Sequence, residues 1–167
     1  MKAARGLIAA AGLLLAACGG GSLGPVAPPD ALTPPTAPAA GAGQPAGELG
    51  PQDLADGACG SFFWGMAAPN PFLVFVNETE GVARVFADGE AHGFFFAPGT
   101  GPLIVGDAYE RRFRDETRGL HFHLTGTATR IVDDGLRIER AVIRRHALSG
   151  GQVVTPLIGL FTCRDGG

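Results

Sequence analysis

Lysine is almost absent from this chain of 167 residues, where Lys2 is the only one. Serine is scarce as well, and of the two serines in residues 54–167, Ser61 and Ser149, neither stands in the Gly-x-Ser-x-Gly pattern of a nucleophile elbow. The glycine-rich stretch 99–107 has no lysine and precedes no helical pattern, which argues against a phosphate-binding loop. We therefore expect a protein that is not an enzyme, and we assign no catalytic, cofactor-binding or metal-ligating residue.

The apolar run 6–15 is too short to cross a hydrocarbon core, which needs roughly 20 residues. Lys2 and Arg5 give a basic region before it, and small residues end it. This order of regions is typical of a secretory signal peptide. The run ends in the motif Leu15-Ala16-Ala17-Cys18. In all four positions this motif resembles the lipobox of bacterial lipoproteins.

Several expectations follow from the resemblance to bacterial lipoproteins. It implies that residues 1–17 are removed as a signal peptide and that Cys18 receives a diacylglyceryl group, with further acylation of the new amino terminus. Two or three acyl chains hold a protein to a membrane far more firmly than one. Gly19 stands where some bacteria use Asp for inner-membrane retention, so we expect the periplasmic face of the outer membrane. The membrane is thus the first expected partner.

Cleavage before Cys18 would leave 11 arginines, 16 acidic residues and no lysine, a net charge of about −5. Nucleic-acid binding draws most of its affinity from a basic face that neutralises phosphates. The composition therefore argues against a nucleic-acid partner.

Residues 18–53 are predicted to form a disordered tether. They are rich in proline, alanine and glycine, contain no aromatic residue and show neither helical nor strand periodicity. Such a segment cannot bury enough apolar surface to fold, and it has polyproline-II character. Its average span would be about 30–35 Å and its full extension about 100 Å. The folded domain is then predicted to cover residues 54–167, enough for one core.

Cysteine is also rare, with three in the chain and no Cys-x-x-Cys spacing. Cys59 and Cys163 lie near the two ends of the predicted domain. Because export leads to an oxidising compartment, we expect these two to form a disulfide bond. The alternative is two free thiols.

The domain is predicted to be all-β, a small antiparallel barrel or sandwich of seven or eight strands in a meander. Strand patterns rich in valine and phenylalanine, or alternating in polarity, cover 71–77, 81–89, 92–98, 120–129, 136–148 and 152–163. Turn signals separate them at 77–81, 88–89, 133–135 and 149–151. The stretch 106–119 fits either a short helix or a strand that ends in a turn. Pro156 predicts an edge position or a bulge in the last strand.

His121 and His123 alternate with apolar residues, so both imidazoles should lie on the polar face of one strand. Two such histidines can share a metal ion, although a catalytic zinc site usually has a third protein ligand. His92 or His146 could supply that ligand only where the fold brings one close. A solvated strand face is the simpler interpretation.

Eight arginines form two groups in the second half of the domain. These are Arg111, Arg112, Arg114 and Arg118, and then Arg137, Arg140, Arg144 and Arg145. Arginine suits bidentate binding of carboxylate or phosphate, which would fit an anionic ligand. The alternative is a solvated face of cross-strand ion pairs with Glu110, Glu116 and Glu139.

Two aromatic runs, 62–64 and 94–96, cannot be buried entirely, because a strand beside one core buries only alternate residues. Either Phe95, or both Phe94 and Phe96, should point outward. An outward aromatic residue could mark a binding patch or a barrel mouth, or could be covered by the loop 99–106.

Three functions stay open at this point. The first is a membrane-anchored, non-enzymatic binding module of the envelope, with an envelope protein, a glycan or a small anionic ligand as partner. The second is a structural accessory lipoprotein of an outer-membrane assembly. The third is a metal-dependent enzyme that uses His121 and His123.

Overall fold

The computed structural model describes residues 47–98, 103–133, 135–146 and 150–166, which belong to one compact unit. Cys18, the predicted signal peptide and most of the predicted tether lie outside these residues. The described residues form eight strands and no helix. In this part of the chain there is accordingly no helical segment that could span a bilayer.

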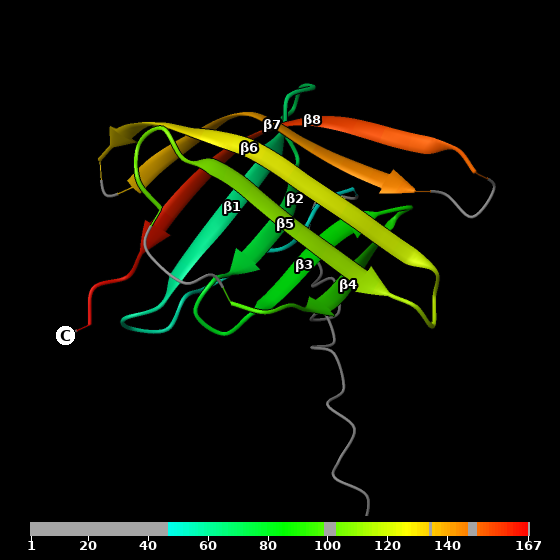
Figure 1. The fold of residues 1–167 in the computed structure, drawn as a ribbon, viewed down its shortest axis with the longest axis horizontal. Helices are drawn as coiled ribbons and strands as arrows, with labels where there is room; N and C mark the ends of the chain where they lie inside the picture. Colours follow the sequence, from blue (N-terminus) through cyan, green and yellow to red (C-terminus); the bar gives the residue numbers. More distant parts are fainter. Residues whose placement is uncertain (1–46, 99–102, 134, 147–149, 167) are drawn as a thin grey trace, which may run out of the picture. The chain divides into compact units, whose positions relative to one another are not determined.

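The eight strands form one antiparallel sheet with the order β4-β3-β2-β1-β8-β7-β6-β5. They are β1 (Cys59–Gly65), β2 (Phe72–Asn77), β3 (Val82–Ala87), β4 (Glu90–Phe95), β5 (Ala108–Asp115), β6 (Leu120–Val132), β7 (Gly135–His146) and β8 (Gln152–Cys163). The sheet curls into a nearly closed barrel in which β4 and β5, its two edge strands, come together (Figure 1). The predicted all-β fold is thus confirmed, with a barrel-like rather than a sandwich arrangement.

Two meanders, β1–β4 and β5–β8, make up the sheet, and the pairing of β1 with β8 joins them. Cys59 and Cys163 stand directly opposite each other on these two strands, and their sulfur atoms are bonded at 2.04 Å. The expected disulfide therefore joins the first strand to the last, across a sequence separation of 104 residues.

Turn chemistry explains two of the connections. Ala87 pairs with Glu90, so Asp88 and Gly89 alone connect β3 to β4, and their φ angles are 54° and 87°. Positive φ at both central residues defines the turn that matches strand twist, and Asp-Gly is a preferred sequence for it. The stretch 106–119, for which a helix and a strand were both open, forms the strand β5. The strand ends in a turn, in which Asp115 Oδ1 accepts a hydrogen bond from the Arg118 backbone N–H (3.1 Å).

Pro156 lies in an inner strand but at a locally free edge. The β1 partners of β8 end at Leu157, so residues 152–156 pair with β7 alone. Pro156 accepts a hydrogen bond from the Met66 backbone N–H (3.2 Å), and a missing N–H costs little at such a position. The predicted edge position is therefore correct for this residue, although not for β8 as a whole.

The main core fills the barrel, and its largest side chains are aromatic. Its fully or nearly fully buried members include Phe63, Phe94, Tyr109, Phe113, Phe122, Leu124, Ile138 and Leu157. Gly159 lets Phe63 approach the backbone of β8, because a Cβ at residue 159 would lie only 2.4 Å from Phe63 Cε1. This contact requires glycine at that position.

A second cluster covers the outer face of β1–β3, where Phe62 and Phe75 pack with Leu49 and Leu54. The Leu49 backbone N–H donates to the Phe72 carbonyl oxygen (2.7 Å). Ordered structure therefore starts before residue 54, the predicted boundary. Phe62 and Phe75 point away from the barrel interior because side chains alternate along a strand. The segment that precedes β1 covers them.

Candidate functional site

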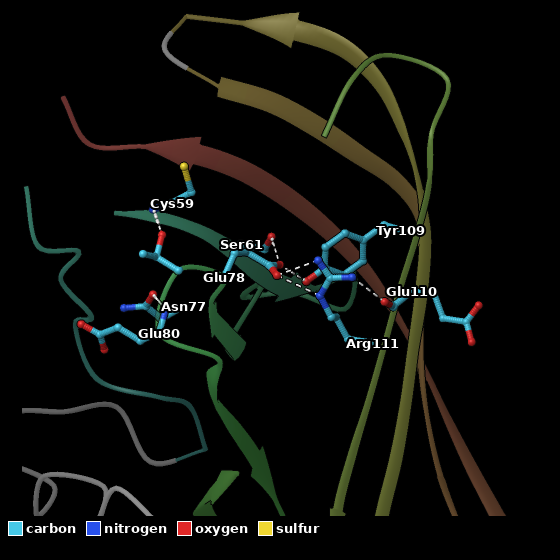
Figure 2. Close-up of polar contacts among 9 residues, drawn as sticks. Cys59, Ser61, Asn77, Glu78, Glu80, Tyr109, Glu110 and Arg111 are labelled. Carbon is cyan, nitrogen blue, oxygen red and sulfur yellow. Dashed lines mark hydrogen bonds and ion pairs between the residues drawn. The ribbon is translucent and has the colours of Figure 1, made fainter. Parts of the chain in front are cut away.

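A network of polar side chains is buried inside the barrel around Glu78, which follows β2 (Figure 2). Glu78 Oε1 accepts hydrogen bonds from Ser61 Oγ (2.9 Å) and from the Tyr109 hydroxyl (2.7 Å). Glu78 Oε2 accepts from Arg111 Nε (2.8 Å) and pairs with Arg111 Nη2 (2.7 Å). Each carboxylate oxygen thus has two partners, so this buried charge is well compensated.

This network also explains how the barrel stays closed between β4 and β5. Tyr109 and Arg111 lie on β5, whereas Ser61 and Glu78 belong to the β1–β2 half. Arg111 also lies over the ring of Phe96 (5.9 Å), and the rings of Phe96 and Phe113 are in contact at 5.8 Å. Side chains therefore tie the free edge of β5 to the other meander. Because Ser61 and the carboxylate are already saturated and buried, we interpret the network as structural.

Tyr109 provides a direct pH test of the network. Burial raises the pKa of its hydroxyl well above the ordinary value of 10, and the charge of Glu78 raises this pKa further. Above pH 10 the unfolded chain therefore loses a proton that the folded domain retains, so the stability contribution present below pH 10 is lost as pH rises. Tyr109 is the only tyrosine, so ultraviolet titration reports it alone. We expect tyrosinate to appear only as the domain unfolds.

The matched variant for this test is Tyr109→Phe. This substitution should lower the free energy of unfolding by about 1–2 kcal/mol at neutral pH. Above pH 10, the free energy of unfolding of the variant should fall less steeply than that of the unchanged chain, by up to about 1.4 kcal/mol per pH unit. A tyrosine that ionises near pH 10 while circular dichroism stays native would contradict the buried assignment.

The accessible polar site lies on the outer face of β5, β6 and β7. Cross-strand pairing aligns Arg112, His123 and Arg144 in one row and Arg114, His121 and His146 in the next. The intervening residues Phe113 and Phe122 point into the core. Five of these six arginine and histidine side chains line a surface cavity of about 190 Å³. The sixth, Arg144, does not line it. We call these six residues the Arg/His face.

Two carboxylates neutralise part of the Arg/His face. Glu110 Oε1 lies 2.6 Å from Arg112 Nη2 and 3.0 Å from His123 Nε2. Glu116 Oε2 lies 3.2 Å from His121 Nε2. Arg114 has no carboxylate partner among the described residues, and Arg144 donates only to Thr125 Oγ1 (3.2 Å). The face thus retains uncompensated guanidinium donors in solvent.

The arginine groups of the sequence separate in space. Arg111 turns into the barrel toward Glu78, and Arg145 turns inward and pairs with Asp88, unlike its neighbour Arg144. Of the three acids expected as ion-pair partners, Glu110 pairs with Arg112 and His123, Glu139 pairs with Arg137, and Glu116 pairs with His121. Ion pairing therefore uses much of the positive charge, and two of the arginines without a carboxylate partner among the described residues, Arg114 and Arg144, lie on the Arg/His face.

The histidines proposed as metal ligands have distinct surroundings. His121 and His123 are half-buried on the outer face, and His146 stands opposite His121. His92 is 3% exposed inside the barrel and so cannot join them. In the described ranges, no group of three or more His, Cys, Asp or Glu side chains could hold a metal ion.

The aromatic residues follow the expected alternation. Phe94 is 2% exposed in the core, whereas Phe95 is 44% exposed on the outside. Ser149 and residues 99–102 lie outside the described residues, so the predicted covering loop and the turn at 149–151 are only partly described.

The sequence did not predict the side-chain contacts of Glu78, Tyr109 and Asp88. Glu78 and Asp88 lie in turns, where acidic residues are ordinary, and their partners are 17 to 57 positions away. The one available signal was the lone tyrosine, which occupies an inward position of β5 among arginines. Comparison with models of protein families, curated proteins and solved structures gives no match to this chain.

Proposed function

We propose that this chain is a lipid-anchored protein of the bacterial envelope whose β-barrel domain is a non-enzymatic binding module. The ligand is an anion that carries phosphate or carboxylate groups, and the Arg/His face binds it. The anchor is Cys18 after removal of residues 1–17, and the periplasmic face of the outer membrane is the proposed location.

The anchor is supported by the sequence. The lipobox motif follows a basic and then an apolar region in the required order, and a proline-rich stretch follows it. The disulfide between Cys59 and Cys163 is consistent with export to an oxidising compartment.

The binding role is supported above all by the clustering of Arg112, Arg114 and Arg144 with three histidines on one outward sheet face. A guanidinium group presents five N–H donors and binds carboxylate or phosphate in a bidentate manner. The imidazole N–H groups add hydrogen-bond donors beside this positive charge. Glu110 and Glu116, which contact this face, oppose that charge and favour a ligand with several anionic groups.

The test uses the proposed mature chain, residues 18–167, with Cys18→Ser, so that neither acyl chains nor the apolar run 6–15 obscures binding. One arm measures sedimentation with phosphatidylglycerol–phosphatidylcholine vesicles, and the other measures inorganic pyrophosphate by calorimetry. Arg112→Gln/Arg114→Gln should weaken vesicle binding about 10–30-fold, since each arginine near an anionic surface contributes about 1 kcal/mol. Raising the salt concentration to 1 M should weaken binding as well.

The matched control is Arg130→Gln, which removes an exposed arginine outside the Arg/His face and should change affinity less than twofold. Vesicle binding alone identifies a lipid headgroup, and pyrophosphate binding identifies a soluble phosphate ligand. Failure of both probes, or binding that the double variant leaves intact, would refute the proposal. Stoichiometric zinc binding that is lost in His121→Ala/His123→Ala would instead favour the metal alternative.

A further inference from the structure

A second cavity, of about 160 Å³, opens at the barrel end near the turn between β3 and β4. Its apolar lining comes from two opposite parts of the sheet and includes Leu73, Val85, Phe86, Ala87, Ile143 and Val153. An engineered apolar cavity of about 150 Å³ in another protein stays dry and binds benzene. This space is therefore large enough for an apolar group of about six carbons.

A cation stands at the rim of this cavity. Arg145 extends from β7 and pairs through Nη1 with Asp88 in the turn between β3 and β4. The Arg145 side chain is 19% exposed, and Asp88 is the only partner that the described residues give it. Since a guanidinium group has five N–H donors, Arg145 keeps free donors beside an apolar cavity.

We propose that this barrel-end cavity binds a short alkyl carboxylate of about five to seven carbons. The alkyl chain fills the apolar space, and the carboxylate binds Arg145 in competition with Asp88. Both parts of the ligand follow from the lining, because a neutral apolar ligand would leave Arg145 unused and a small anion would leave the cavity empty. This site uses none of the six residues of the Arg/His face and is independent of the function proposed above.

The chain length of the ligand gives the first test. The full chain with Cys18→Ser is titrated calorimetrically with sodium acetate, butanoate, hexanoate and octanoate. Each added methylene should tighten binding about fourfold until the cavity is full, so hexanoate, with four more methylenes, should bind about 250-fold more tightly than acetate. Beyond about seven carbons the gain per methylene should fall. Hexan-1-ol should bind about tenfold more weakly than hexanoate, because it lacks the charge that Arg145 binds.

Variants of the two charged residues at the rim distinguish the contribution of charge to the affinity from the contribution of the apolar cavity. Arg145→Gln should bring hexanoate down to the affinity of hexan-1-ol and leave hexan-1-ol itself unchanged. Asp88→Asn removes the competing carboxylate and should tighten hexanoate about threefold; asparagine tolerates the φ of 54° at this position. Arg130→Gln is the charge-matched control and should have no effect.

Variants of the lining test the location. Ala87→Leu fills the cavity, and Val153→Phe covers it from a position that is 47% exposed and so tolerates substitution. Both should abolish binding of hexanoate and hexan-1-ol, with native unfolding temperatures as the check on folding. Ile131→Phe, on a side chain that is 76% exposed and outside the cavity, is the control. Affinity independent of chain length, or hexanoate binding unchanged in Arg145→Gln and Val153→Phe, would overturn the proposal.

Discussion

Glu78→Ala should destabilise the domain by about 3–5 kcal/mol, measured as the free energy of unfolding in urea. The substitution leaves the hydroxyls of Ser61 and Tyr109, which are 0% and 2% exposed, without their acceptor, and removes the counterion of Arg111. Loss of one partner from a buried ion pair costs this much because the remaining groups stay buried and unpaired. The tie between β5 and the first meander is lost at the same time.

Two further variants make this result specific. Glu78→Gln keeps an oxygen acceptor and removes only the charge, so it should cost less than Glu78→Ala. Glu80→Ala removes an exposed carboxylate from the same turn and should change stability by less than about 0.5 kcal/mol. If Glu78→Ala and Glu80→Ala had equal effects, the network would not be what closes the barrel.

Removal of the disulfide should have the second large effect. Cys59→Ser/Cys163→Ser frees a loop of 104 residues in the unfolded chain, which corresponds to about 4–5 kcal/mol in the chain-entropy model. Replacement of both cysteines avoids a reactive single thiol. The double variant should unfold at a lower urea concentration than the unchanged chain.

Chemical reduction is the internal check on the disulfide prediction. Reduction should lower the stability of the unchanged chain to that of the double variant and should leave the double variant unaffected. Cys18→Ser lies outside the domain and should leave the urea midpoint unchanged. Equal stability of oxidised and reduced protein would show that the bond contributes nothing, because the pairing of β1 with β8 already holds the two ends.

The sequence predicted the fold well because its signals are local. Alternation of polar and apolar residues identified β6, and Asp88-Gly89 identified a two-residue turn through its tolerance of positive φ. The cysteine pair followed from compartment and position. Alternation of polar and apolar residues does not encode the curvature of a sheet, so it did not distinguish a barrel from a sandwich; the contact between the edge strands β4 and β5 does.

The Arg/His face and the cavity near Arg145 depend on the register between neighbouring strands. The sequence alone gives only a weak indication of that register. Arg144 and Arg145 must point to opposite faces of β7, but which one faces outward depends on the pairing with β6 and its irregularities. The alignment of His121 with His146 has the same origin. Tyr109, which binds Glu78, and Arg145, which pairs with Asp88, come from strands far away in the chain, and no local pattern marks such contacts.

The claim on which the proposed function depends is acylation of residue 18, and mass spectrometry of the protein taken from its own membrane tests it most directly. We expect a mature chain that begins at Cys18 and carries the added mass of a diacylglyceryl group, with or without a third acyl chain. An unmodified chain that begins at any other residue, with no acyl mass, would contradict the lipid anchor and the envelope location together.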